Sequence, residues 1–217
     1  MVRLSALADL DFLQIGLLLA VLIASLTFHE AAHAWAADRL GDPTARLLGR
    51  LSLNPLVHID LIGTVVFPLI AISTGVPLIG WAKPVPVDVR NLAAPRRDFA
   101  LVAAAGPASN LVLALAAAGA FAVVRALGDD AGPIAYAVVV AVLNAVVINV
   151  LLAVFNLIPV PPLDGGNILL GVLPASLVGA VERIRPYGIF VLYGLMFSGL
   201  LSRITYPVQD AILGWLL

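Results

Sequence analysis

The chain has 217 residues, of which 62% are hydrophobic and 12% are charged, and its formal net charge at pH 7 is −1. Soluble domains carry about a quarter charged residues, so this composition, with a mean hydropathy of +1.07, excludes an ordinary soluble protein and indicates an integral membrane protein. The near-neutral charge argues against a nucleic-acid partner. The absence of cysteine excludes disulfides, thiolate zinc sites and cysteine nucleophiles.

The first predicted element is a long helix over residues 11–39, with a lipid-grade apolar part from 12 to 28. At 1.5 Å per residue this helix is about 43 Å long, which exceeds the ~30 Å hydrocarbon core of a bilayer. The sequence His29-Glu30-Ala31-Ala32-His33, an HExxH pattern, directly follows the apolar part. The pattern is therefore expected in the last third of a membrane span.

The HExxH pattern predicts a metal site. Residues i and i+4 of a helix share one face, so His29 and His33 can direct two imidazoles at one ion. Glu30 lies about 100° around the helix, close enough to take a proton from a water that the metal activates. Ionisable residues at membrane depth are costly and usually functional, which favours a site over a chance pattern.

The segment after this helix is predicted to be non-helical at residues 44–60. Residues 50–54 alternate as a short half-buried strand would, and its edge could hold an extended peptide; a plain connecting hairpin is the equal alternative. Residues 61–79 are apolar but contain two glycines and two prolines, which favours a re-entrant segment over a full crossing. Residues 80–97 are polar and proline-rich, and we expect them to be extended.

Two further long helices are predicted at residues 99–124 and 134–155. The first carries Gly106-Pro107-Ala108-Ser109-Asn110 near its start, and the second is followed by Asn156 and a proline-rich turn to Asp164. Further apolar segments are a short one at residues 168–180, a last span at 187–201 and a tail at 211–217.

The predicted fold class is an all-α polytopic membrane protein, a single domain over residues 1–217. Three long transmembrane helices form its core, with additional apolar segments and a short membrane-associated β or extended region. Most basic residues fall in short loops, which places those loops and the HExxH end of the span on the cytoplasmic side. The bias toward Arg, Ala, Val and Leu is typical of a GC-rich prokaryotic genome. The predicted location is therefore the prokaryotic cell (inner) membrane.

A catalytic zinc ion takes three protein ligands, and the HExxH pattern supplies two. Asp164 is the best candidate for the third, because it follows a membrane helix at similar depth and prolines hold its approach extended. Taken alone, Asp-Gly-Gly is more readily a turn than a ligand position. The other candidates are His58, Asp60 and Glu182, and spacing does not exclude His58.

The motifs together resemble the site-2 protease family of intramembrane metalloproteases, in its compact branch without a PDZ domain. The resemblance is carried by HExxH at 29–33, Gly106-Pro107-x-x-Asn110, Asn156-x-x-Pro159-x-Pro161-x-Leu163-Asp164-Gly165, and the stretches 49–55 and 80–87. HExxH alone is moderately specific, whereas its combination with the later motif is highly specific.

This resemblance implies a zinc metalloendopeptidase with one Zn²⁺ bound by His29, His33 and Asp164, and with Glu30 as the catalytic base. It implies that Asn156 and Asn110 bind substrate or the transition state. The implied substrates are transmembrane proteins in the lipid bilayer, often regulators already cleaved by another protease (regulated intramembrane proteolysis). The alternatives are a catalytically inactive membrane scaffold of the same fold and a membrane metal transporter.

Overall fold

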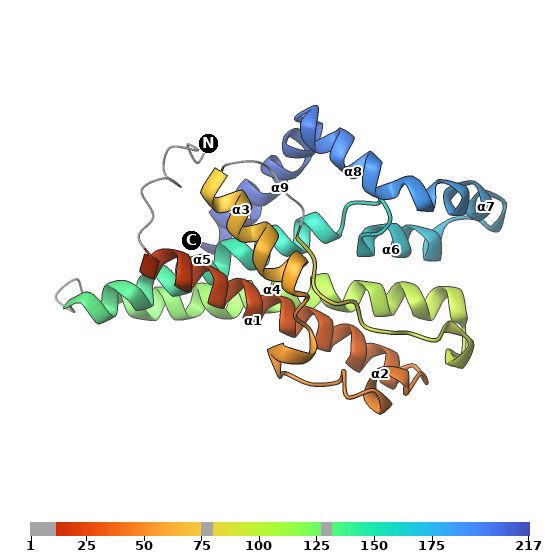
Figure 1. Cartoon of the computed structure of the whole chain (residues 1–217), viewed down its shortest axis with the longest axis horizontal. Coiled ribbons are helices and arrows are strands. Elements are labelled where there is room, and N and C mark those ends of the chain that lie inside the picture. Colours follow the sequence, from red (N-terminus) through yellow and green to blue (C-terminus); the bar gives the residue numbers. More distant parts are fainter. Residues whose placement is uncertain (1–11, 75–79, 127–131) are drawn as a thin grey trace.

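Three long helices lie side by side and form the centre of the molecule (Figure 1). They are α1 (Phe12–Arg39), α4 (Pro95–Ala126) and α5 (Gly132–Asn156). The computed structural model describes residues 12–74, 80–126 and 132–217. Within these ranges the same three helices are long and apolar enough to cross a membrane, as predicted.

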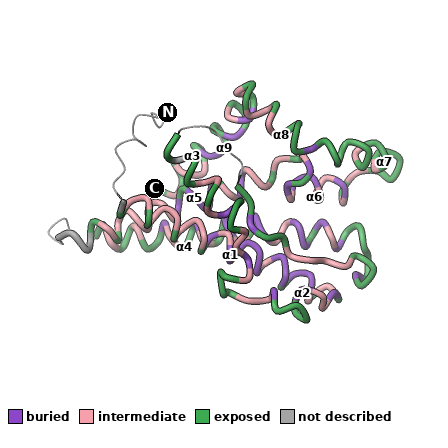
Figure 2. Tube along the Cα trace, viewed as in Figure 1, coloured by how far each residue is buried: buried purple, intermediate pink, exposed green. Residues whose placement is uncertain are grey.

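Small side chains allow the three helices to approach closely. Ala37 of α1 packs on Val102 of α4, and Ala114 of α4 packs on Val150 of α5. Burial is concentrated where α1 and α4 run together (Figure 2). Helices in lipid gain no hydrophobic energy from leaving water, so close packing of small residues and hydrogen bonds between helices hold the bundle together.

The predicted β region is wrong: the described residues contain no strand. After α1, the chain forms α2 (Thr44–Leu47) and η2 (Pro55–Val57), with turns and bends between them. Gly49 has a φ of +69°, which ends α2, and the Arg50 N–H then donates to Ala45 O at 2.8 Å. Asn54 caps η2 by accepting from the Leu56 N–H at 3.1 Å. These local bonds replace a strand ladder.

The following segment leads away from the loops and is later met again by the chain. The π-helical turn η3 (Leu61–Val66) continues into α3 (Phe67–Thr74), and together they extend about 21 Å, less than the ~30 Å needed to span a bilayer. Trp81 N donates to Gly63 O at 3.1 Å, so the chain is again beside the start of η3. The re-entrant path stays a prediction, and residues 75–79 of the predicted segment lie outside the described residues.

Residues 81–88, here called the strap, form an irregular segment that runs past the HExxH turn of α1. It is held by loops and side chains and not by a sheet. Lys83 N donates to His58 O at 2.8 Å, and the buried Arg50 guanidinium donates to Lys83 O at 2.5 Å. Val87 packs against the buried alanines of α1. The 3-10 turn η4 (Val89–Asn91) then leads to α4.

Asp42 joins the end of α1 to the end of the strap. Its fully buried carboxylate accepts from Thr44 N at 3.1 Å, Asp88 N at 2.7 Å and Asn91 Nδ2 at 2.9 Å. Burial alone would raise the pKa of Asp42, but the bonds from Asn91, Thr44 and Asp88 outweigh it, so the pKa lies below its usual 3.8.

We expect Asp42→Ala to lower the free energy of unfolding at pH 7 by about 2 kcal/mol, because four part-buried donors lose a charged acceptor. Because the folded pKa is depressed, this stabilisation is complete above the unfolded value of 3.8 and is lost as pH falls through the folded pKa. Unfolding of the detergent-purified protein at pH 7 and below pH 4 measures both effects. Asp38→Ala, which removes a surface ion pair with Arg46, is the control. Equal stability of Asp42→Ala and wild type at pH 7 would contradict this role.

The C-terminal part differs from the prediction. It forms α6 (Asp164–Val172), α7 (Ala175–Ile184), η5 (Arg185–Tyr187), α8 (Gly188–Phe197) and α9 (Leu200–Leu216). The apolar segment expected at 168–180 is broken before Pro174. The span expected at 187–201 is also wrong, because Gly199 has a φ of +72° and the chain bends by 77° there. The expected tail belongs to α9. This bent pair of helices counts as one further span at most.

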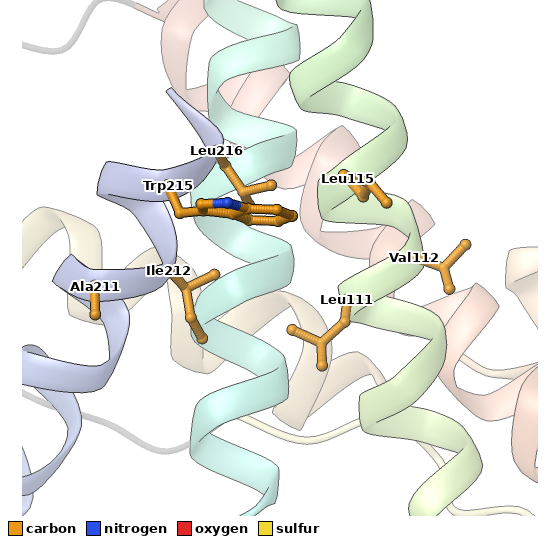
Figure 3. Close-up of a pocket in the computed structure, with 7 residues that line it drawn as sticks. All are labelled: Leu111, Val112, Leu115, Ala211, Ile212, Trp215 and Leu216. Atoms are coloured by element: carbon orange, nitrogen blue, oxygen red, sulfur yellow. The ribbon is translucent and has the colours of Figure 1, made fainter.

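A shallow groove of about 500 Å³ lies between α4 and α9 (Figure 3). Its seven lining residues are all apolar or aromatic: Leu111, Val112, Leu115, Ala211, Ile212, Trp215 and Leu216. A hollow of this composition on a membrane span offers no groups for chemistry and is suited to contact with lipid.

Candidate metal centre

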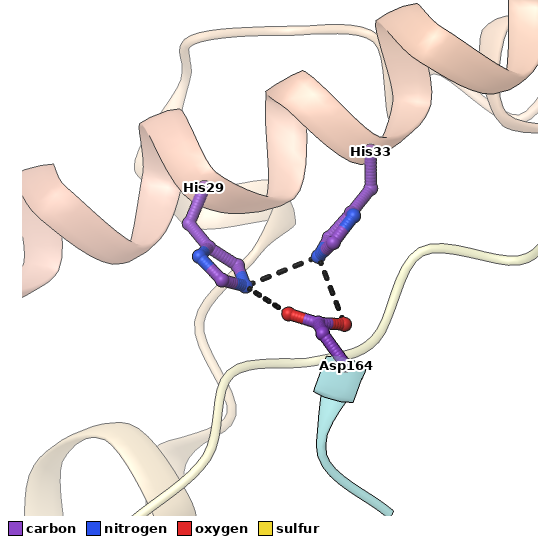
Figure 4. Close-up of side chains that lie close together, drawn as sticks. All are labelled: His29, His33 and Asp164. Atoms are coloured by element: carbon purple, nitrogen blue, oxygen red, sulfur yellow. Dashed lines mark hydrogen bonds and ion pairs between the residues drawn. The ribbon is translucent and has the colours of Figure 1, made fainter. Parts of the chain in front are cut away.

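Three side chains converge from two elements far apart in the sequence. His29 and His33 come from successive turns of α1, and Asp164 is the first residue of α6 (Figure 4). His29 Nε2 lies 3.1 Å from Asp164 Oδ2, and His33 Nε2 lies 3.4 Å from Asp164 Oδ1. The two Nε2 atoms are 3.1 Å apart. Among the described residues, these three form the one group of His, Asp or Glu side chains close enough to share a metal ion.

These separations fit a zinc ion. Bonds of 2.0–2.1 Å in a tetrahedron place neighbouring ligand atoms about 3.3 Å apart, which is close to the three distances above. Asp164 Oδ2 is buried and accepts no hydrogen bond from the described part of the chain. A buried carboxylate oxygen without a donor is costly, and a bound cation would remove that cost.

The second nitrogen of each imidazole determines what the first can do. His29 Nδ1 lies 2.6 Å from Asn110 Oδ1, and His33 Nδ1 lies 2.7 Å from Val102 O. Both partners are acceptors, so both Nδ1 atoms carry a proton, and when the imidazoles are neutral both Nε2 atoms present a lone pair. Two neutral imidazoles and a carboxylate in this arrangement repel one another unless a proton or a metal cation lies between them.

Glycines place Asp164 at this position. A Cβ on Gly165 would lie 2.4 Å from Ile158 O, and one on Gly166 would lie 2.5 Å from Pro161 N. Only residues without a side chain allow the first turn of α6 to pack on the preceding turn. At its other end, α6 is tied to α4 by the Arg96 guanidinium, which donates to Leu170 O at 2.6 Å.

Gly106 of α4 leaves room for both histidines. A Cβ at this position would lie 2.4 Å from His33 Nε2 and 2.6 Å from His29 Cε1. We expect Gly106→Ala to displace both rings and to weaken zinc binding by at least about tenfold, comparable with the loss of an outer-shell partner. Zinc titration against a chromophoric chelator measures this. Gly119→Ala is the matched control, because a Cβ there meets nothing within 4 Å. Unchanged zinc affinity in Gly106→Ala would contradict the close packing.

Glu30 lies beside the three ligands and faces a cavity of about 570 Å³. Its carboxylate is buried, and Oε2 accepts from the Val85 N–H of the strap at 3.1 Å. Apolar residues of α1, α5, α8 and the strap line the rest of the cavity, among them Leu26, Leu152, Phe155, Ile189 and Leu192. The metal group thus lies at the wall of a mainly apolar chamber.

The two asparagines predicted to bind substrate occupy different places. Asn156 lies on the cavity wall, with one N–H of its amide donated to Leu152 O at 2.9 Å. Asn110 is fully buried behind His29, and its Oδ1 and Nδ2 atoms both have partners within the protein. No polar atom of Asn110 faces the cavity, so the substrate role predicted for it does not fit its position.

The other candidate ligands lie outside the metal group. His58 is buried and its Nε2 lies 2.8 Å from Ser52 O. Asp60 caps η3 by accepting from Ile62 N and Gly63 N. Glu182 pairs with Arg185 at 3.3 Å on the surface of α7.

Sequence reasoning missed two features of the site. One is the contact between the strap and Glu30, which is made by the Val85 N–H; this is a main-chain contact with no motif of its own. The other is a set of polar side chains behind His29, formed by Ser25, Asn110 and Asn149. The signal available was a polar residue within an apolar span, which Asn149 shares with Asn144 of the same helix.

Comparison with known proteins agrees with the geometry. Residues 129–198, which include Asp164, match the family model described as "Peptidase family M50". The chain is 35% identical over 203 residues to "Putative zinc metalloprotease YwhC" of Bacillus subtilis, covering 89% of this chain and 86% of that protein. It is 31% identical over 188 residues to "Putative zinc metalloprotease Rip2" of Mycolicibacterium smegmatis, covering 86% of this chain and 69% of that protein. No solved structure matches it.

Proposed function

Because the chain belongs to peptidase family M50, the site-2 protease family, we propose that it is an intramembrane zinc metalloprotease that cleaves transmembrane segments of other membrane proteins. The observation that carries this proposal is the convergence of His29, His33 and Asp164 beside Glu30, at the wall of an apolar cavity between membrane helices. The names of the related metalloproteases support zinc as the metal, and we propose one ion per chain because the described residues contain one such donor set.

The chain's own residues supply binding and proton transfer. His29, His33 and Asp164 would hold the zinc ion, which when bound acts as a Lewis acid toward water and the scissile carbonyl. Glu30 would take the proton of the attacking water and deliver it to the leaving amine. The Val85 N–H fixes one oxygen of that carboxylate. Asn156, on the cavity wall, is proposed to contact the substrate backbone or the developing oxyanion.

The nature of the chamber supports a membrane substrate. Its apolar walls favour apolar side chains, and a helical segment must unwind there because an intact helix keeps its carbonyls in hydrogen bonds. We propose that a regulator already cleaved by another protease is one such substrate, because a short free end would make unwinding easier. We place the site toward the cytoplasmic side of a prokaryotic inner membrane, because the basic residues cluster in the short loops at that end.

The test uses the full chain reconstituted in liposomes with a tagged single-span substrate. We expect cleavage within or just beneath the span, loss of cleavage after zinc is chelated, and recovery when zinc is added back. A soluble peptide of the same sequence should be cleaved far less. A zinc-loaded protein that cleaves no membrane substrate from a broad panel would favour the scaffold alternative, and zinc uptake without cleavage would favour the transporter.

A further inference from the structure

A chain of buried amides connects the three membrane helices behind His29. Asn110 of α4 and Asn149 of α5 are 0% and 2% exposed, and Ser25 of α1 is 3% exposed. Asn110 Nδ2 donates to Asn149 Oδ1 at 2.8 Å. Asn149 Nδ2 donates to Ser25 Oγ at 2.9 Å and to Ala145 O at 2.8 Å. This chain ends on the imidazole of His29.

The orientation of each amide follows from its neighbour. Ala145 O is a main-chain carbonyl and can only accept, so Asn149 must present Nδ2 to it and Oδ1 to Asn110. Asn110 must then present Nδ2 to Asn149, which leaves Oδ1 for His29. His29 must therefore carry its proton on Nδ1, and its Nε2 presents a lone pair toward His33 and Asp164.

We infer that Asn149, supported by Ser25, is a positioning residue for the metal site: through Asn110 it fixes the tautomer of His29 and thus which nitrogen binds zinc. Without Asn149, only the long 3.4 Å contact of Nδ2 with Ser25 O would hold the Asn110 amide, and the amide could turn and offer Nδ2 to His29. The proton would then move to Nε2, which cannot bind a metal while protonated. This inference deepens the proposed function, but it concerns zinc binding and not cleavage.

The alternative is that these amides only join helices, as asparagines often do in membrane bundles. Asp at position 110 separates the two roles, because a carboxylate offers only acceptors in either orientation. In the Asn110→Asp background, His29 keeps its proton on Nδ1 whatever stands at position 149. A positioning role therefore disappears in that background, whereas a loss of helix packing remains.

The experiment measures zinc affinity of the detergent-purified full chain by competition with a chromophoric chelator. We expect Asn149→Leu to bind zinc about tenfold more weakly, the lower end of the range for outer-shell partners. Asn110→Asp should bind zinc within a few-fold of wild type, because the higher ligand basicity that a carboxylate gives offsets the loss of the donor to Asn149 Oδ1. Adding Asn149→Leu to Asn110→Asp should change zinc affinity less than about twofold. The smaller effect of Asn149→Leu in this background than in wild type is the coupling between the two positions that a double-mutant cycle measures. Asn144→Leu, on the same helix and outside this chain of amides, should leave affinity unchanged.

A second measurement follows the tautomer directly. The chain has three histidines, so ¹⁵N NMR of histidine-labelled, metal-free protein can follow the protonated nitrogen of His29. Asn149→Ser, whose hydroxyl both donates and accepts, serves if the leucine variant does not fold. We expect Nδ1–H in wild type and a mixture in the variant. The inference would be overturned if the position-149 variant bound zinc with wild-type affinity. It would also be overturned if the position-149 substitution weakened zinc binding as much in the Asn110→Asp background as in wild type. Failure to cleave any substrate would leave both results intact.

Discussion

Glu30→Gln is expected to lower the rate of peptide-bond cleavage by about 10²–10⁴-fold, the usual contribution of a general base. Glutamine keeps the size of the side chain and can still accept from the Val85 N–H, but it cannot take a proton from water. Because Glu30 lies outside the group of three ligand atoms, zinc content should stay at the wild-type level. Single-turnover cleavage of a membrane substrate and metal analysis of the same preparation measure the two quantities.

The control is Glu182→Gln, which changes an exposed glutamate on α7 and should leave both quantities unchanged. Residual cleavage near the wild-type rate in zinc-loaded Glu30→Gln would remove Glu30 from the proton-transfer role. Loss of zinc together with activity would instead make Glu30 a ligand, contrary to its position.

Asp164→Ala is expected to produce the largest change in metal binding. It removes one of three converging donors and leaves two imidazole lone pairs 3.1 Å apart. We expect zinc affinity to fall by more than the roughly 10–100-fold typical of outer-shell changes, with cleavage lost in parallel. Equilibrium dialysis of the full chain against buffered zinc measures the affinity.

Two variants serve as controls for Asp164→Ala. Asp60→Asn keeps the cap of η3, because asparagine accepts at a helix start as aspartate does, and it should bind zinc normally. His58→Ala removes a buried histidine whose Nδ1 has no hydrogen-bond partner among the described residues, and it should also keep zinc. If His58→Ala lost zinc and Asp164→Ala kept it, the third ligand would be His58 and the assignment to Asp164 would be wrong.

The sequence was informative where function depends on local periodicity. His29 and His33 share a face because they are four residues apart, and the long apolar runs predict α1, α4 and α5. The interruptions within 61–79 also predicted a segment that returns. In each case the residues concerned lie on one continuous helix or one short segment, so spacing along the chain is enough.

The sequence was misleading where tertiary contacts decide. Residues 50–54 alternate like a strand, yet their hydrogen bonds are made by caps and turns. Gly199 divides an apolar run that looks continuous in the sequence. The positive φ of Gly199 bends the chain, and hydropathy does not predict that backbone angle. Asn110 lies behind His29 and is fully buried; its motif does not show which side of the helix meets which neighbour.

The distribution of the zinc ligands along the chain has a consequence for biogenesis. His29 and His33 enter the membrane with the first span, whereas Asp164 emerges only after the third span has been synthesised. Synthesis proceeds from the N-terminus, so the nascent chain holds two of the three donors until α5 is in place. We therefore expect metal acquisition to be a late maturation step. The proposed zinc site would form only in a protein whose spans are already assembled, and an incompletely inserted chain would lack it.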